Sequence, residues 1–400
     1  MITPFRLLCA TGFFAIFSST ISKSPVLPLF AAYLGADPSE VGIVAAVSAF
    51  TGVFASLPAG ILADRCGRRR MLLISAVVFA TAPFLYLAVA HIWQLALIRL
   101  YHGIATAIFL PVGLAFVSEL FQRERGEKMG WFSTATLLGR FLAPVAGGTL
   151  MGLFMLGDPN RFYAVYAVCG AAGVATFFLA LRIPKEETCR LSSRSLKDSW
   201  ATFKSVVATK AIVITSAVEA GILFVYGIFE TFVPLYAVKA GLSVSAIGIL
   251  LSAQVITLAL SKPAMGRFSD RHGRPPQIFW GAILGAVCIG LFSLAVSFAA
   301  LLVLSILLGL SLSILTSASS AYIADLSRKE GRGSAMGILG SVMDIGHTTG
   351  PLVAGFVILH YGFGAAFLVA ALVIAVAAAG FLVHAGKDVL FGISHKEAAP

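Results

Sequence analysis

A few ionisable side chains stand inside long apolar stretches of this sequence, and they have the clearest potential for chemistry. A charge in hydrocarbon costs at least about 2.5–3.5 kcal/mol unless it faces a cavity or a partner. Ion pairing, proton transfer and recognition of a charged ligand are the roles open to such groups. The candidates for a substrate or proton cavity are Lys23, Arg99, Arg140, Glu219, Glu230, Asp344 and His347.

Several of these residues have alternative roles. Asp344 and His347 are three residues apart, on one face of a helix, and could carry a proton because histidine titrates near neutrality. A satisfied polar bridge is the alternative for this pair, and Glu219 is a second candidate proton carrier. Arg99 could tune a nearby proton site or act as a structural hydrogen-bond clamp. Arg140 could bind a substrate anion or pair with an internal acid.

Enzyme chemistry has no support in the sequence. It contains no phosphate-binding loop for ATP, no HExxH motif and no recognisable nucleophile motif. The 5 cysteines are scattered and have no CxxC spacing. We therefore expect no catalytic residues, no metal and no cofactor. An intramembrane enzyme or a lipid-handling protein is a distant alternative.

The composition predicts an all-α membrane protein. Hydrophobic residues make up 58% of the chain and charged residues only 12%, about half the share in a soluble domain. The apolar runs are about 20 residues or longer, as a helix needs to cross a bilayer, and they lack the short alternation of β-barrel strands. We predict twelve transmembrane helices at about 5–34, 40–63, 71–90, 92–120, 129–153, 162–183, 209–240, 244–266, 277–297, 299–324, 333–358 and 362–384.

The net charge of +11 follows membrane topology. Lysine and arginine concentrate in alternate loops, at 65–70, 123–128, 185–210, 267–274 and 328–332. Loops rich in lysine and arginine stay on the cytoplasmic side. We therefore expect both termini to be cytoplasmic and no nucleic acid to be bound.

The sequence also contains an internal repeat. The segment PLFAAYLGADPSEVG (28–42) aligns with PLYAVKAGLSVSAIG (234–248) at a step of 206 residues, and RGEKMG (125–130) aligns with RGSAMG (332–337) at 207. The repeat predicts a six-helix half at 1–183, a cytoplasmic linker at 184–208, a second six-helix half at 209–384 and a cytoplasmic tail at 385–400. The two halves would surround a central cavity.

The repeat also relates two opposite charges. Lys23 and Glu230 are 207 residues apart and so occupy nearly equivalent positions in the two halves. They could pair across a cavity, or they could form a split site for a zwitterionic substrate. Lys23 could alternatively bind an anion alone.

Four short motifs, at 25–28, 60–70, 99–103 and 139–148, together resemble those of the major facilitator superfamily, and within it the twelve-span drug:proton antiporters. GILADRCGRRR (60–70) looks like the signature loop between spans two and three, and RLYHG (99–103) resembles the span-four motif. GRFLAPVAGG (139–148) resembles the antiporter motif of span five, with Ala143 in place of one glycine. PVLP (25–28) is similar to a span-one motif of the same antiporters. Span one has no acidic residue, unlike many multidrug antiporters, which weakens the case for cationic drugs.

The resemblance implies a gate at two charged hinges, 60–70 and 266–276. Asp64 and Asp270 would sit against the N-terminal ends of spans eleven and five, while Arg68 could reach Glu119 and Arg274 could reach Asp325. The alternative is that the charges of the two hinges only determine the membrane topology. The gate residues are Gly60, Asp64, Arg65, Gly67, Arg68, Glu119, Asp270, Arg271, Gly273, Arg274 and Asp325.

The resemblance also implies a helix-packing motif that seals the path between the halves. Small residues four apart let helices approach closely, and proline permits a bend. Ordinary helix packing is the alternative. The motif residues are Gly139, Pro144, Gly147, Gly148, Gly346, Gly350 and Pro351.

By resemblance, the protein would be a proton-coupled efflux antiporter for small amphipathic, drug-like compounds. It would work by alternating access in the bacterial cytoplasmic (inner) membrane. Its partners would be a small-molecule substrate, protons and the lipid bilayer, and we expect a monomer. Export or uptake of an anionic or zwitterionic metabolite is the alternative, and Lys23, Arg99 and Arg140 favour it.

Overall fold

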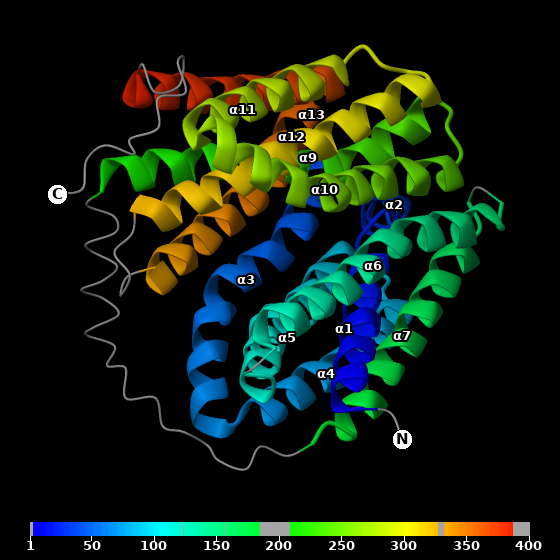
Figure 1. Cartoon of the computed structure of the whole chain (residues 1–400). Coiled ribbons are helices and arrows are strands. Elements are labelled where there is room, and N and C mark those ends of the chain that lie inside the picture. Colours follow the sequence, from blue (N-terminus) through cyan, green and yellow to red (C-terminus); the bar gives the residue numbers. More distant parts are fainter. Residues whose placement is uncertain (1–2, 123, 156, 185–208, 327–331, 387–400) are drawn as a thin grey trace. The chain divides into compact units, whose positions relative to one another are not determined.

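The computed structural model describes residues 3–122, 124–155, 157–184, 209–326 and 332–386 (Figure 1). These residues form helices and no β-strand, and every predicted apolar run is mostly helical. The helices are α1 (Pro4–Ile21), α2 (Val26–Tyr33), α3 (Pro38–Cys66), α4 (Arg68–Leu85), η1 (Tyr86–Ala88), α5 (Ile92–Leu120), α6 (Arg125–Gly152), α7 (Asn160–Leu181), α9 (Lys210–Lys239), α10 (Val244–His272), α11 (Arg274–Leu291), α12 (Phe298–Leu326) and α13 (Arg332–Ala385).

The chain divides into two compact units. Unit 1 comprises Met1–Ser193 and Glu230–Ser252, and unit 2 comprises Arg194–Phe229 and Ala253–Pro400. The last part of α9 and the first part of α10 thus belong with unit 1. The predicted boundaries of the two halves stay a prediction. Most of the predicted linker and tail, at 185–208 and 387–400, lies outside the described residues.

Nine helices among the described residues are long and apolar enough to cross a membrane. Two of the predicted spans, on α6 and α11, are helical but fall outside these nine, because glycine, polar and charged residues lower their mean hydropathy. The last of the nine, within α13, covers both predicted spans 333–358 and 362–384. The two parts of α13 meet at Gly362, where φ is 82°. Only glycine adopts such a φ without strain.

The first predicted span is interrupted. α1 ends at Ile21 and α2 begins at Val26, so Lys23 lies in a short segment between two helices. Pro25 contributes to the interruption because proline has no N–H to donate to the preceding turn. The break places the Lys23 side chain away from the regular helical register.

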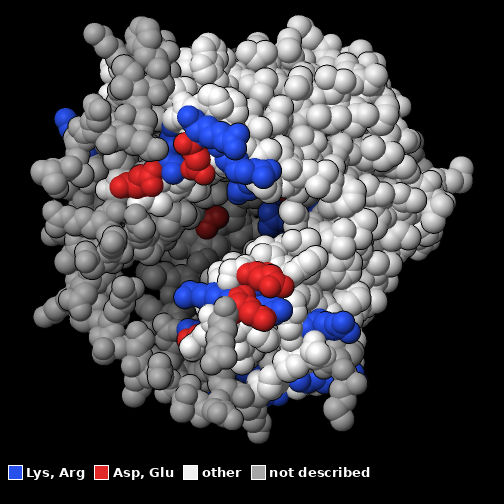
Figure 2. All heavy atoms as spheres, viewed as in Figure 1, with Lys and Arg blue, Asp and Glu red and all other residues white. Residues whose placement is uncertain are grey.

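The outer surface is largely apolar. Figure 2 shows that wide areas of the described surface carry no charge and that the charged side chains gather in clusters containing both signs. Large hydrophobic side chains such as Phe54, Trp93 and Leu260 are exposed. Exposed apolar surface of this extent is expected where helices face lipid.

The two charged hinges have the same backbone geometry. In the first hinge α3 ends at Cys66, Gly67 has a φ of 91°, and α4 follows directly. In the second, Gly273 has a φ of 92° between α10 and α11. A side chain at either glycine would strain the turn. The sequence repeat is therefore also a structural repeat.

The start of α3 is stabilised by a capping box. The Asp37 carboxylate accepts hydrogen bonds from the Ser39 hydroxyl and from the backbone N–H groups of Ser39 and Glu40. The Ser39 hydroxyl and these N–H groups hold the pKa of Asp37 below its usual value. The cap is therefore ionised at neutral pH, and it complements the positive end of the helix dipole.

Apolar packing fills the interior of each unit. In unit 1, α1 packs against α6 and α7, and α5 packs against α3 and α4; in unit 2, α11 packs against α12 and α13. The buried ring of Phe132 belongs to the core of unit 1. A Cβ atom at Gly12 or at Gly113 would lie 2.9 Å from this ring. Two glycines thus make room for one aromatic ring.

Glycines also bring helix backbones into contact in each unit. A Cβ atom at Gly139 would lie 2.6 Å from the Phe13 carbonyl oxygen, and one at Gly346 would lie 2.1 Å from the Ala220 carbonyl oxygen. Both residues of the second pair stand 207 positions after those of the first. Gly350 makes a similar contact, at 2.3 Å from the Phe224 carbonyl oxygen. These contacts align the N-terminal part of α1 with α9 at a step of 207.

Replacing Gly139 by alanine should destabilise the protein, because the new methyl group would push α6 away from α1. We expect a loss of about 1–3 kcal/mol, the usual range for overpacking. Gly130→Ala on the same helix is the matched control, since nothing lies within 4 Å of the added Cβ atom. Alanine is the better helix former by about 1 kcal/mol, so the control should be unchanged or slightly stabilised. Thermal unfolding in detergent, followed by circular dichroism, measures both, and equal effects would refute the contact argument.

Candidate functional site

An ion pair between Lys23 and Glu230 is the central charged arrangement of unit 1. The Lys23 ammonium nitrogen lies 2.6 Å from Glu230 Oε2, and the side chains are 21% and 10% exposed. Lys23 projects from the break between α1 and α2, and Glu230 from α9. The structure thus brings together two residues that the sequence repeat relates. Their partial exposure leaves the pair accessible to a ligand.

Arg99 on α5 is buried among hydroxyl groups. It donates hydrogen bonds to the Ser48 hydroxyl at 2.6 Å, to the Tyr86 hydroxyl at 3.3 Å and to the Ser22 hydroxyl at 3.4 Å. Its Nε atom has no hydrogen-bond partner. None of these contacts supplies a negative charge. Arg99 therefore connects three helical segments, as expected of a clamp, while its charge stays uncompensated.

Arg140 adds a third positive charge to unit 1. Its side chain projects from α6 and is exposed. Within the described residues it has no hydrogen bond or ion pair. The charges of Arg140 and Arg99 both act on Lys23. Within the described residues of unit 1, the three cations therefore share one electrostatic environment with one carboxylate, that of Glu230.

Glu219 on α9 is the most deeply buried acid of unit 2. It is fully buried, and the Ser319 hydroxyl of α12 donates a 2.5 Å hydrogen bond to its Oε2 atom. Its Oε1 atom has no hydrogen-bond partner. The positive charge of Lys262 acts on this carboxylate. A buried acid with one oxygen unused is a group that can hold a proton.

The repeat shows that the fold does not require this acid. At the repeat steps of 207 and 206 residues, Glu219 corresponds to Gly12 and Ser319 corresponds to Gly113. In unit 1 the space between those glycines holds the ring of Phe132. One unit has an aromatic ring where the other has a carboxylate and a hydroxyl.

Asp344 and His347 lie together on α13. Both side chains are partly buried, and the His347 ring stacks on the Tyr226 ring of α9 with centroids 5.3 Å apart and planes at 22°. The backbone at His347 is also close to α9, since its oxygen would be 2.8 Å from a Cβ atom at Gly227. His347 therefore belongs to the contact between these two helices.

Each charged hinge contains an arginine paired with an acid at the end of a neighbouring helix. Arg68 forms an ion pair with Glu119 of α5. Arg274 Nε donates to Asp325 Oδ2 of α12 at 2.5 Å, and its Nη2 atom lies 3.1 Å from Asp270 Oδ1. The duplicated motif thus forms the same kind of bridge in both units.

Other predicted gate residues are only partly described. The side chains of Asp64 and Arg65, and the surroundings of Gly60, lie outside the described residues. Arg271 is exposed. The predicted contacts of Asp64 and Asp270 with the ends of spans eleven and five stay predictions.

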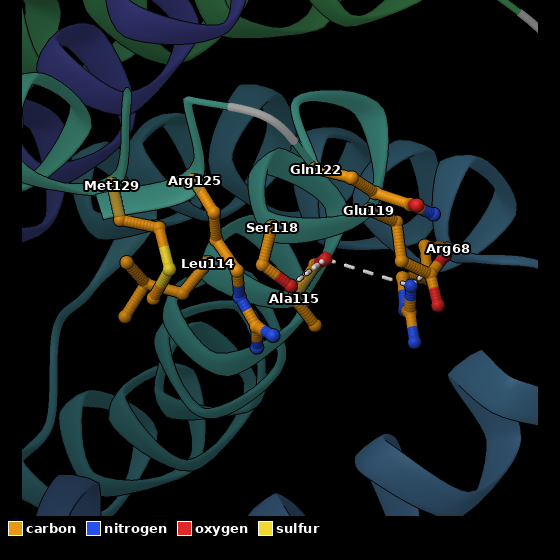
Figure 3. A pocket seen from close by; sticks show the side chains of 8 residues that line it. All are labelled: Arg68, Leu114, Ala115, Ser118, Glu119, Gln122, Arg125 and Met129. Carbon is orange, nitrogen blue, oxygen red and sulfur yellow. Dashed lines mark hydrogen bonds and ion pairs between the residues drawn. The ribbon is translucent and has the colours of Figure 1, made fainter. Parts of the chain in front are cut away.

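A cavity of about 560 Å³ adjoins the first hinge. Figure 3 shows the Arg68–Glu119 pair at one end, Leu114 beside Met129 at the other, and the Arg125 guanidinium between them. The lining residues are Arg68, Leu114, Ala115, Ser118, Glu119, Gln122, Arg125 and Met129. The Glu119 side chain is 56% exposed, so water reaches the ion pair. Such a pair contributes about 0–1 kcal/mol and can open at little cost.

A family model described as Major Facilitator Superfamily matches residues 8–247 and 239–390, which is nearly the whole chain. The chain belongs to the major facilitator superfamily. It is therefore a multi-pass membrane transporter and not an enzyme, and its helical fold is that of this superfamily.

Relatives within the superfamily align along most of its length. Multidrug resistance protein MdtG of Klebsiella pneumoniae is 28% identical over 357 residues, 87% of this chain and 85% of the relative. MdtG of Escherichia fergusonii is 29% identical over 370 residues, 88% and 86% of the two chains. An uncharacterised superfamily transporter of Methanocaldococcus jannaschii is 23% identical over 363 residues, 89% of each chain.

Solved structures of other superfamily transporters have the same fold. The nucleoside transporter NupG matches with a TM-score of 0.76 and 16% identity over 96% of this chain and 99% of that one. A bacterial homologue of the human lysosomal transporter Spinster, inward-facing and occupied, matches with a TM-score of 0.82 and 14% identity over 100% of both chains. At these identities the likeness concerns the fold alone.

Sequence reasoning missed several residues of this superfamily transporter's sites. Ser22, Ser48 and Tyr86 surround Arg99, and Ser319 binds Glu219. Serine and tyrosine are too common in apolar helices to be singled out one at a time. The repeat does contain a signal for Ser319, because this serine corresponds in the alignment of the two halves to a glycine, Gly113.

Replacing Ser48 by alanine should destabilise the transporter. The change removes the shortest hydrogen bond of Arg99, at a partly buried position, and a hydrogen bond to a charged group contributes about 1.5–3 kcal/mol. Ser133→Ala, at an exposed serine of α6, should change stability by less than about 0.5 kcal/mol. Thermal unfolding of both variants in detergent is the measurement. A Ser48→Ala variant as stable as the control would exclude the clamp.

Proposed function

We propose that the protein is a proton-coupled antiporter that exports small amphipathic compounds across the bacterial inner membrane. Alternating access would move the cargo, and both termini would be cytoplasmic. The observation that carries the proposal is Glu219, a fully buried acid with one oxygen unpartnered, at a position where the repeat has a glycine.

A proton on Glu219 would remove the cost of a buried charge. An ionised carboxylate in a low-dielectric interior is expensive unless it is paired and hydrogen-bonded. Ser319 supplies a hydrogen bond, and Lys262 supplies an attraction that favours the ionised form. Opposing influences of this kind allow a group to gain and lose a proton as its exposure changes. The acid is therefore suited to carry protons between two states.

Other features support the export of drug-like cargo. The MdtG relatives carry the name multidrug resistance protein. The glycines of α6 and α13 that resemble the antiporter motif lie against neighbouring backbones. Lysine and arginine in alternate loops support cytoplasmic termini. Asp344 and His347 are retained as the alternative route for the proton.

The hinge pairs provide a latch for alternating access. Arg68–Glu119 and Arg274–Asp325 stand at the ends of helices that the positive-inside rule assigns to the cytoplasmic side. Each pair is accessible to water and therefore weak. Weak pairs can form in one state and separate in the other without trapping the transporter.

Glu219→Gln should abolish proton-driven transport while leaving exchange of cargo for cargo. Everted membrane vesicles with an acidic lumen and a pH-sensitive dye measure the first, and counterflow of labelled cargo measures the second. Amphipathic cations, zwitterions and anions would be added in turn, and active cargo should alkalinise the wild-type lumen. Glu127→Gln, at an exposed acid of α6, is the matched control and should transport normally.

The same assay separates the two candidate acids. Normal proton-driven transport in Glu219→Gln, with loss in Asp344→Asn, would move the proton to Asp344. Retention in both variants would contradict the assignment of the proton to either acid. If no class of compound changed the lumenal pH of vesicles with the wild-type protein, the result would contradict the proposed antiport.

Arg274→Gln should slow turnover with little change in cargo affinity. The change removes both ion pairs of the second hinge, and two weak pairs together are worth about fivefold in the balance between states. Arg267→Gln removes an exposed arginine of α10 in the same hinge and serves as the control. Initial transport rates and equilibrium binding would be compared. Unchanged turnover would refute the latch.

A further inference from the structure

We infer that the cationic cluster of unit 1 binds an anionic group of the cargo. In the absence of cargo, Glu230 is the ion-pair partner of Lys23, and the anionic group of the cargo then takes the place of the Glu230 carboxylate. The cationic cluster comprises Lys23, Arg99 and Arg140. The ligand class is an organic anion, such as a carboxylate attached to an apolar body. This inference rests on the proposed export of amphipathic compounds and specifies which of them are recognised.

The balance of charge is the first support. Among the described charged residues of unit 1, Arg99, Arg140 and Glu230 stand away from helix ends and Lys23 lies in the break between α1 and α2, while the others stand within a few residues of a helix end. Three cations therefore face one carboxylate. The hydroxyl groups around Arg99 accept hydrogen bonds but supply no charge. Because unpaired charge in the membrane is costly, the site gains from a ligand that brings negative charge.

The repeat shows that the excess of positive charge is not a requirement of the fold. Arg99 corresponds to Ser305, which is buried and bonds to a carbonyl of its own helix. Arg140 corresponds to His347, and Lys23 corresponds to Glu230. No position of the cationic cluster has a lysine or arginine as its counterpart. The cluster is therefore specific to the first half of the chain.

The three residues of the cationic cluster differ in their exposure, and this decides which of them a ligand can contact. The Lys23 side chain is 21% exposed and that of Arg140 is exposed, whereas Arg99 is only 3% exposed. A ligand can therefore touch Lys23 and Arg140. Arg99 acts on the ligand through its charge, because its own hydrogen bonds are directed to Ser48, Tyr86 and Ser22.

The Lys23–Glu230 contact gives the site a built-in competitor. Glu230 presents to Lys23 the same group that an anionic cargo would present, at 2.6 Å. The backbone around Lys23 is held by bonds from Lys23 N to the Thr20 carbonyl and from Leu27 N to the Lys23 carbonyl. The backbone of Lys23 therefore stays in place while the carboxylate partner of its side chain is exchanged. Cargo and Glu230 cannot both take the closest position at Lys23.

This exchange makes a prediction that a structural salt bridge does not. Loss of Glu230 removes the competitor, so an anion should bind more tightly to Glu230→Gln. If the pair instead served a cationic cargo, Glu230 would be the ligand and Lys23 the competitor. The sign of each effect therefore identifies the cargo charge.

The test is calorimetric binding to the purified full-length protein in lipid nanodiscs, without a pH gradient. Three probes share one apolar body: naphthoate, the neutral naphthamide and naphthylmethylammonium. We expect the wild type to bind naphthoate most tightly. Glu230→Gln should raise the naphthoate affinity about tenfold, and Lys23→Gln and Arg140→Gln should each lower it about tenfold or more. The affinity for naphthamide should stay the same in all variants.

A control variant and the Arg140→Gln variant keep the test decisive. Arg182→Gln removes an exposed cation at the end of α7 and should bind all probes as the wild type does. Arg140→Gln carries the test if Lys23→Gln does not fold, because the Arg140 side chain is exposed. Equal affinity for the three probes, or tighter binding of naphthylmethylammonium in Lys23→Gln with its loss in Glu230→Gln, would overturn the inference.

The result is independent of proton coupling. Anion binding with the expected signs, together with no proton movement in the vesicle assay, would retain the anion site and reject the proposed antiport. Proton-driven export of cations with no naphthoate binding would retain the antiport and reject the anion site.

Discussion

An ionised side chain in a hydrocarbon layer must be compensated, and this constraint accounts for the placement of charge in the structure. Most charged residues stand at helix ends, where water or a neighbouring acid is available. The few in the middle of helices, or in the break between α1 and α2, have specific surroundings. Lys23 has a carboxylate, Arg99 has hydroxyl groups and Glu219 has a serine. The charged sites in the membrane interior can therefore be recognised as charged residues within otherwise apolar segments.

The two units share a scaffold and differ in their interior chemistry. The hinges repeat in backbone geometry and in their ion pairs, and the glycine contacts of α6 repeat in α13. The membrane interior of unit 1 is predominantly cationic, whereas that of unit 2 contains the acids Glu219 and Asp344. The two halves thus keep the same hinges and helix contacts, while their interior positions differ.

Much of this architecture could be predicted from the sequence. Hydropathy located the helices, and the repeat related Lys23 to Glu230 and Arg68 to Arg274, because both signals are local or periodic. The break before α2 was missed, since an apolar run does not show where its backbone changes direction. The predicted division between spans 333–358 and 362–384 agrees with the change of direction at Gly362. The hydroxyl partners of Arg99 were missed because they come from separate segments that meet only after folding.

The Phe132 ring between Gly12 and Gly113 has a consequence for how the two halves can evolve. A carboxylate introduced at Gly12 would collide with the ring, and loss of the ring alone would leave an empty space in the core. Each step is harmful without the other. Selection that acts on one substitution at a time therefore keeps the buried acid in the second half of the chain. The asymmetry of the duplicated protein is maintained by packing as well as by function.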